Sequence, residues 1–144
     1  MIAVDTNILV YAHRTDSPFH VAAAGTITEL AEGSGAWAIP WPCVHELLAV
    51  VTNARVYDPP TATAVALDYV NALLQSPTLV LLAETDLHWK ALSSLMAAGR
   101  IAGGRVHDAR IAAICIQHGV RELWSADRDF SRFPDLTIVN PLMS

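Results

Sequence analysis

The sequence predicts a single α/β domain over residues 1–144, built on a mainly parallel, twisted sheet of about four to five strands with helices on both faces. Its length of 144 residues suits one domain with a substantial core. An apolar fraction of 53% against 16% charged residues excludes a disordered chain. Short apolar runs alternate with helical patterns along the sequence, which favours βαβ crossovers and therefore parallel strands.

The predicted strands are short runs rich in apolar residues and bounded by turn-forming or capping residues. The first run ends in an acid, and the last run is placed at a sheet edge. In a parallel sheet with helices on both faces, such runs are buried and need not alternate with polar residues. The predicted strands are, in order, Ile2–Asp5, Ala36–Pro40, Thr78–Ala83, Glu122–Ser125 and Thr137–Val139.

The predicted helices carry apolar residues three or four positions apart and start or stop at recognisable signals. Capping side chains precede the first helix, a proline occupies the first turn of the third, and a glycine follows the last. The third helix is apolar nearly all round and is expected to be largely buried. The predicted helices are, in order, Ile8–Ala12, Phe19–Glu32, Pro42–Asn53, Thr61–Leu74, Thr85–Ala98 and His107–His118, with Asp127–Phe133 as a short turn or helix.

Net charge gives no general sign of a nucleic-acid partner. Nine Lys and Arg residues against fourteen Asp and Glu residues leave a formal charge of −5, whereas nucleic-acid-binding domains are usually basic. Seven of the nine bases nevertheless lie from Lys90 onward. This asymmetry points weakly to an anionic ligand near the C-terminal part of the chain.

The remaining compositional features favour a cytosolic protein. Cys43 and Cys115 lie in apolar helical patterns without the spacing of a secreted disulfide scaffold, so we interpret them as reduced, buried thiols. The N-terminus has no cationic segment before its apolar run, and no apolar stretch approaches the ~20 residues of a membrane span. We therefore expect no membrane association.

Four acidic residues stand where they would be costly without a compensating charge. Asp5 ends the first strand, Glu46 lies inside an apolar helix, Asp108 opens another helix, and Asp127 follows the fourth strand. A buried carboxylate is unfavourable unless a positive charge lies beside it, and no Lys or Arg is close in sequence to the first two. The simplest compensating charge is a divalent metal ion.

Three of these acids also have purely structural explanations. Asp5 suits a helix N-cap, Asp108 suits the first turn of a helix through the macrodipole, and Asp127 suits a turn. Glu46 has few structural reasons to lie among apolar neighbours, and this favours a functional role. Parallel α/β sheets bind ligands beyond the carboxyl ends of their strands, which is where Asp5 and Asp127 are placed.

Four segments containing these acids resemble one family. The sequence IAVDTNILV at 2–10, VHEL at 44–47, HDARIAA at 107–113 and WSADRDF at 124–130 is similar to PIN-domain ribonucleases, and most similar to the VapC toxins of bacterial toxin–antitoxin pairs. The resemblance spans nearly the whole chain in the expected order. It implies a PIN-like fold over residues 1–144.

The resemblance also implies roles for individual residues. Asp5, Glu46, Asp108 and Asp127 match the acidic quartet that holds Mg²⁺ or Mn²⁺ in the family, and Asp129 matches an accessory acid that only some members use. Small polar groups next to these acids would orient the carboxylates. The matching polar residues are Thr6, Asn7 and Ser125.

The activity that the resemblance implies is endoribonuclease cleavage of a structured RNA, a transfer RNA or ribosomal RNA. Mg²⁺ and Mn²⁺ prefer oxygen ligands and activate water for attack on a phosphodiester. The implied partners are the RNA substrate, a VapB-like antitoxin and a second copy of the chain in a homodimer. We expect the dimer contacts on the helices before Asp58 and on the amphipathic helix from Thr61.

Residues that bind RNA are harder to identify. Arg100, Arg105 and Arg110 flank Asp108 and could reach a phosphate backbone, although a solvated loop and an exposed helix face explain them equally well. Trp41 suits core packing, with stacking on a base as the alternative. The six histidines show no metal-ligand spacing, and adjacent residues such as His45 and Glu46 diverge by about 100° on a helix.

Other functional classes fit the sequence less well. A phosphatase of the haloacid-dehalogenase type requires Asp-x-Asp where this chain has Asp5-Thr6-Asn7. A phosphoacceptor receiver domain requires a Lys after a late strand, and the only Lys is Lys90 in a predicted helix. The non-enzymatic alternative is an acidic interaction module that grips a basic partner. It would bind that partner without consuming RNA.

Overall fold

The computed structural model describes residues 1–128, 130 and 133–143, and the following statements concern these residues. Five strands form one parallel sheet, as predicted, and the structure gives their order as β3-β2-β1-β4-β5. The strands are β1 (Ile2–Val4), β2 (Trp37–Pro40), β3 (Leu79–Leu82), β4 (Glu122–Trp124) and β5 (Thr137–Val139).

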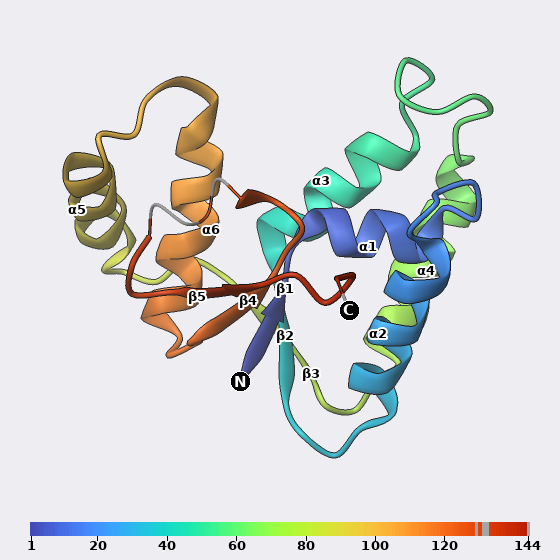
Figure 1. The fold of residues 1–144 in the computed structure, drawn as a ribbon, viewed down its shortest axis with the longest axis horizontal. Helices are drawn as coiled ribbons and strands as arrows, with labels where there is room; N and C mark the ends of the chain where they lie inside the picture. The colour runs from blue at the N-terminus through green and yellow to red at the C-terminus, as the bar shows by residue number, and fades with distance from the viewer. Residues whose placement is uncertain (129, 131–132, 144) are drawn as a thin grey trace.

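Six α-helices cover the sheet. Helices α5 and α6 lie on one side of it, and α1, α2 and α4 lie on the other (Figure 1). The described helices are α1 (Thr6–His13), α2 (His20–Glu32), α3 (Trp41–Val51), α4 (Thr63–Leu74), α5 (His88–Gly99) and α6 (Val106–Gln117), with a 3₁₀ turn, η1 (Gly103–Arg105), before α6. The predicted α/β class and the coverage of both faces are confirmed.

The core is centred on the three middle strands. All four residues of β2 are buried, and Trp37 at its start is fully buried, with its indole nitrogen donating to the Ser76 hydroxyl at 3.1 Å. Leu123 of β4 is equally inaccessible. Burying a large apolar side chain stabilises the fold by about 1.5–3 kcal/mol, so these central strands hold the sheet edge in a fixed position.

Two predicted helix starts are wrong, and one hydrogen bond explains each of them. Helix α4 begins at Thr63 because Thr61 is held away from it: its backbone nitrogen donates to the Val51 carbonyl at 2.7 Å. Helix α5 begins at His88 because Thr85 forms the preceding turn, in which its hydroxyl accepts from the Leu87 nitrogen at 3.2 Å. Side chains that satisfy backbone groups locally compete with helix formation.

The connection from β4 to β5 differs from the others because its described residues form no long helix. Two aromatic rings, Phe130 and Phe133, are buried in it with centroids 6.1 Å apart. The predicted turn or helix at Asp127–Phe133 includes residues 129, 131 and 132, which lie outside the described residues. The buried rings anchor this segment over the sheet and fix the start of β5.

Strand order changes direction between β1 and β4, because the chain first builds outward from β1 to β3 and then crosses to β4 on the other side. Ligands of open α/β sheets bind at such a point, beyond the carboxyl ends of the strands. Asp5 directly follows β1, and Ser125 directly follows β4. Among the described residues, no helix is long and apolar enough to cross a membrane.

Candidate functional site

The four predicted acids line one pocket of about 290 Å³ at the carboxyl edge of the sheet. They come from four different places in the chain: the end of β1, the middle of α3, the first turn of α6 and the segment after β4. The pocket therefore gathers residues that lie far apart in sequence. Its acidic members are Asp5, Glu46, Asp108 and Asp127.

Asp5 is the most buried of the four acids, with 5% of its surface exposed. Its carboxylate accepts hydrogen bonds from the Ser125 hydroxyl at 2.7 Å and from the Thr6 backbone nitrogen at 2.8 Å, so it also caps α1. The Cys43 thiol, itself buried, lies 3.6 Å away and donates to the same carboxylate. Burial raises the pKa of Asp5 to about 6 despite these donors.

Glu46 is half-buried on α3, and its carboxylate accepts a 2.9 Å hydrogen bond from the Thr6 hydroxyl. Thr6 therefore contacts two acids at once, Asp5 through its backbone and Glu46 through its side chain. The negative charge of Glu46 adds to the rise in the Asp5 pKa. The two carboxylates thus lie close enough to repel each other.

Ser125 links the two strands that form the floor of the pocket. Its buried hydroxyl donates to Asp5 and accepts from the Asn7 side-chain amide at 3.3 Å and from the Asp127 backbone nitrogen at 3.0 Å. The Asn7 carbonyl oxygen in turn accepts from the Ala126 nitrogen at 3.2 Å. These bonds tie the start of α1 to the segment that carries Asp127.

Asp108 and Asp127 are half-buried and complete the pocket. Asp108 lies in the first turn of α6, where the helix dipole favours a negative charge. This favourable position at the start of the helix is compatible with a place for Asp108 in the pocket. Both residues also interact with other groups of the protein, so neither is a bare carboxylate.

The donors of the pocket suit a hard divalent cation. Carboxylate, hydroxyl and amide oxygens are the ligands that Mg²⁺ and Mn²⁺ prefer. No Lys or Arg of the described residues forms an ion pair with Asp5 or Glu46, and Asp5 receives only neutral donors. Within the described residues, no set of three Asp, Glu, His or Cys side chains lies close enough together to hold one metal ion. Small side-chain movements would have to draw the carboxylates together.

The three arginines predicted to bind RNA are not among the residues that line the acidic pocket. Arg100 is exposed at the end of α5 in a left-handed conformation (φ 52°), and Arg105 closes η1. Arg110 lines a neighbouring pocket of about 290 Å³ that also includes Glu46, and its guanidinium donates to Glu84 at 2.6 Å. Asp129, the predicted accessory acid, lies outside the described residues.

Several residues near the site were not identified from the sequence. Tyr11 and Tyr57 line the acidic pocket, and Tyr57 also lies beneath the Arg14 guanidinium, 4.3 Å from its ring centre. Tyr11 lies three residues after Ile8 on a helix that follows Asp5, so helical spacing could have indicated it. Tyr57 precedes a Pro-rich break, and we see no sequence signal for its position.

Trp41 is not packed in the core, contrary to the structural explanation given above. Trp41 is 38% exposed, and its ring stacks on that of His45 with ring centres 6.1 Å apart. Trp41 is the first residue of α3. His45 and His107 line the same pocket as Arg110 although they lie on different helices.

Comparison with known proteins identifies the family. The PIN domain matches residues 2–136 of this chain. Ribonuclease VapC43 of Mycobacterium tuberculosis is 36% identical over 142 residues, which is 99% of this chain and 96% of the relative. Both matches cover the four segments that carry the pocket acids. A match of this extent and identity shows common descent and a common fold.

Solved structures agree on the fold. VapBC2 from Rickettsia felis, crystallised with a promoter DNA fragment, matches with a TM-score of 0.67 at 21% identity, over 97% of this chain and 98% of the other. VapC20 of Mycobacterium tuberculosis, a toxin that cleaves the sarcin–ricin loop, matches with a TM-score of 0.66 at 17% identity, over 91% and 93%. At these identities the likeness extends to the fold alone.

Proposed function

Because the chain belongs to the PIN-domain family and, within it, to the VapC ribonucleases, we propose that it is a metal-dependent endoribonuclease and the toxin of a toxin–antitoxin pair. One observation carries this proposal. Four carboxylates from separate elements line one pocket at the point where the strand order changes direction, and the innermost of them, Asp5, has no cationic partner within the described residues.

Asp5, Glu46, Asp108 and Asp127 would hold Mg²⁺ or Mn²⁺, and Asp129 remains a candidate accessory ligand. Bound there, the ion would supply Lewis-acid activation of water and of a phosphoryl oxygen. The chain's own groups prepare this site. Ser125 holds Asp5 and Thr6 holds Glu46, so two carboxylates are oriented before any ligand binds.

The reaction is hydrolysis of a phosphodiester. The oxygen of a water attacks phosphorus, the bond from phosphorus to the 3′ oxygen breaks, and that oxygen takes a proton. The products are a 5′-phosphate and a 3′-hydroxyl. Burial holds the pKa of Asp5 above its usual range in the metal-free protein, whereas a bound cation would favour the ionised carboxylate that serves as its ligand.

The substrate is a structured RNA of the transfer or ribosomal class. A relative of the same fold is a toxin that cleaves the sarcin–ricin loop, and its name supports a ribosomal target. Arg110 lines a pocket that shares Glu46 with the acidic pocket, and Arg100 and Arg105 precede α6 in the chain; these three side chains would contact phosphates.

The partners are a VapB-like antitoxin and a second copy of the chain. Relatives of the same fold were crystallised as VapBC complexes, and an acidic pocket is a natural receptor for an antitoxin arginine. Helix α4 exposes Leu67 and Leu74, with 49% and 45% of their surfaces accessible. They are seven residues apart and so share one face, which supports the dimer contact predicted on this helix.

Cleavage of total RNA by the purified protein tests the activity, in Mg²⁺ or Mn²⁺ and in excess EDTA, with mapping of 5′-phosphate ends. Asp5→Asn, Glu46→Gln, Asp108→Asn and Asp127→Asn should each lower the rate by orders of magnitude, because each removes ligand charge at nearly constant shape. Asp68→Asn, on the exposed face of α4, is the matched control and should cleave normally.

Two results would overturn the assignment. Full cleavage in EDTA would exclude the metal, and full activity in two of the four variants would exclude the shared site. Binding of a basic protein, with no RNA cleavage under any metal condition, would support the alternative function, an acidic interaction module.

A further inference from the structure

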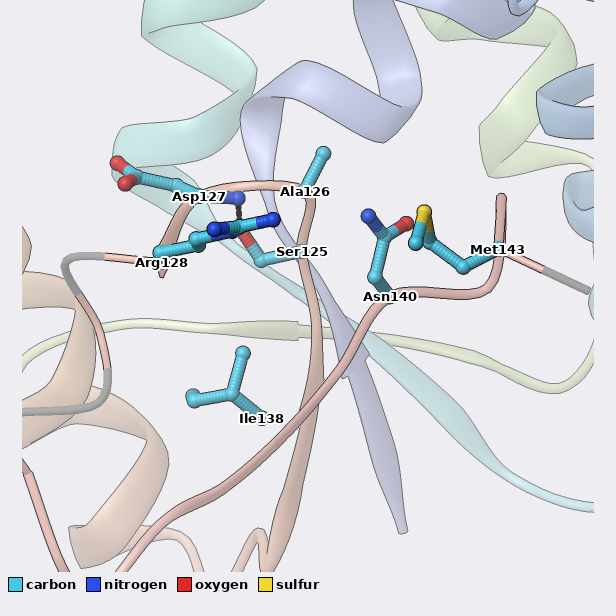
Figure 2. Close-up of a pocket in the computed structure, with 7 residues that line it drawn as sticks. All are labelled: Ser125, Ala126, Asp127, Arg128, Ile138, Asn140 and Met143. Carbon is cyan, nitrogen blue, oxygen red and sulfur yellow. Dashed lines mark hydrogen bonds between the residues drawn. The ribbon is translucent and has the colours of Figure 1, made fainter.

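A second pocket, of about 410 Å³, adjoins the acidic one, and we call it the side pocket. The two pockets share Asp127, so a nucleotide beside a phosphodiester that lies on the acids would be close to the side pocket. Its volume falls in the usual range of ligand-binding cavities. The residues that matter here are Ser125, Asp127, Arg128, Ile138, Asn140 and Met143, and Figure 2 shows them.

Adjacent strand ends build the side pocket. In the β4–β5 pairing Trp124 lies opposite Val139, and the Ser125 nitrogen donates to the Val139 carbonyl at 2.9 Å. Ser125 and Asn140 are therefore the first residues beyond two neighbouring parallel strands. This is the edge at which α/β sheets bind ligands, and the paired strands keep the two residues in register.

The lining combines apolar surface with hydrogen-bond donors. Ile138 and Met143 supply carbon surface, and Met143 is 71% exposed at the rim. Arg128 and Asn140 extend toward the pocket from opposite sides (Figure 2). A nucleobase has the same division, with apolar faces and polar edges, and proteins recognise unstacked RNA bases by stacking together with hydrogen bonds to these edges.

The orientation of Asn140 determines which atoms it offers. Its side-chain oxygen accepts from the Leu142 backbone nitrogen at 3.0 Å, which leaves the amide NH₂ directed into the side pocket. The exposed Arg128 guanidinium can only donate. The Ser125 hydroxyl is already engaged with Asp5 and so offers no competing donor. The Asp127 carboxylate is an acceptor, but it points away from Asn140 (Figure 2), so the two contacts that Arg128 and Asn140 offer are both donors.

We infer that the side pocket binds a guanine base of the RNA next to the cleaved phosphodiester, through the O6 and N7 acceptors of its Hoogsteen edge. This inference rests on the proposed ribonuclease function and adds base specificity to it. Guanine presents two adjacent acceptors there and pairs well with arginine, whereas adenine places an amino donor beside N7. Cytosine also has two adjacent acceptors, O2 and N3. Its ring is smaller than that of guanine, however, and its amino donor lies beside N3.

The test measures binding so that it does not depend on cleavage. The Asp108→Asn protein is titrated in Mg²⁺ with fluorescent RNA oligonucleotides that carry guanine, inosine, 7-deazaguanine, adenine or cytosine at each position in turn. At one position, inosine should bind like guanine because it keeps O6 and N7. Replacing N7 by carbon in 7-deazaguanine should weaken binding by roughly ten-fold, and adenine should be at least as poor.

Variants assign this preference to the side pocket. The variant that has lost the donor to N7 should bind guanine and 7-deazaguanine equally, and Arg128→Ala and Asn140→Ala, each added to Asp108→Asn, should both bind guanine more weakly than Asp108→Asn alone. Arg121→Ala, at the opposite end of β4, and Asn71→Ala, exposed on α4, are matched controls and should keep the preference. End mapping with the active protein should give the same base preference at a fixed distance from the cut, lost in the same two variants.

The outcomes separate this inference from the ribonuclease assignment. Cleavage without any guanine preference, a cytosine preference, or a 7-deazaguanine effect that persists in both variants would overturn the guanine subsite and leave the nuclease standing. Guanine-selective binding that requires Arg128 and Asn140, in a protein that cleaves no RNA, would support the subsite and overturn the nuclease.

Discussion

The Thr6 hydroxyl donates a 2.9 Å hydrogen bond to the carboxylate of Glu46, forty positions away in the sequence. Thr6 is buried in the first turn of α1, so its side chain has little freedom to turn elsewhere. The bond fixes one Glu46 oxygen beside Asp5, whose carboxylate accepts from the Thr6 backbone. One residue therefore sets the spacing of two carboxylates in the pocket.

Replacing Thr6 by Val should impair cleavage without unfolding the protein. Valine keeps the shape of threonine but cannot hold Glu46, and loss of such an orienting bond typically costs 10- to 100-fold in activity or metal affinity. The measurement is the cleavage rate against Mn²⁺ concentration, together with a melting curve. Thr6→Ser restores the hydroxyl and should recover most of the activity. Equal rates for Val and Ser variants would contradict the orienting role.

Much of the fold follows from local sequence patterns because strand and helix signals in this chain are local. The apolar run before Asp5 and the Gly119 stop after α6 each depend on a few neighbouring residues. The predicted helix starts at Thr61 and Thr85 are wrong because hydrogen bonds decide the true starts. The bond of Thr61 to Val51 forms only after α3 has folded, whereas the turn at Thr85 is local and competes with the helix.

The site is less predictable than the fold. Strand order places Asp5 near Ser125, but only the folded packing of α1 on α3 brings Thr6 to Glu46. Asn140 could have been suspected as the residue that follows the last strand. The exposure of Trp41 could not, because an aromatic residue at a helix start gives no sign of which way it turns.

The buried Asp5 carboxylate should make the metal-free protein less stable as pH rises. Its pKa is raised from 3.8 to about 6, chiefly by burial, so folding favours the protonated form. That stabilising contribution is complete below about pH 4 and is lost as pH rises through 6. By linkage the loss is about 3 kcal/mol. The asparagine of Asp5→Asn cannot ionise and should not show it.

Urea unfolding in EDTA at several pH values measures this contribution. The free energy of unfolding of the wild type should fall relative to Asp5→Asn between about pH 4 and pH 7. Comparing the two proteins removes the contributions of all other titrating groups that they share. Parallel pH profiles would show that Asp5 has an ordinary pKa in the folded state.

The proposed dimer should depend on the exposed apolar face of α4. Leu67→Asp combined with Leu74→Asp places two charges where an apolar contact would be buried, which is strongly unfavourable. Light scattering at micromolar concentration should show a dimer for the wild type and a monomer for this variant. The matched control is the double variant Leu87→Asp and Trp89→Asp, which should remain dimeric. Leu87 and Trp89 lie at the start of α5 and are 64% and 74% exposed. This interface would be excluded if the wild type were a monomer, or if the control variant were monomeric and the α4 variant still formed a dimer.

Binding of a divalent ion should reverse the repulsion within the acidic pocket. In EDTA at neutral pH, Asp108→Asn should melt at or above the wild type, because one of four clustered charges is gone. An ion that binds only the folded state stabilises it by about 2.7 kcal/mol at a hundred times its Kd. For a domain of this size that corresponds to a rise in Tm of roughly 5–10 °C.

Melting curves across a Mn²⁺ titration at neutral pH decide whether the four acids form one metal site. Wild type and Asp68→Asn should show the full rise in Tm, since Asp68 lies on the exposed face of α4. Asp108→Asn should need much more Mn²⁺ for the same rise, because it has lost ligand charge. An unchanged Tm in the wild type would refute metal binding. A full rise in the Tm of Asp108→Asn at the same Mn²⁺ concentrations would place the ion elsewhere. Neutralising a true ligand must weaken metal binding, even though it also relieves the repulsion between the carboxylates.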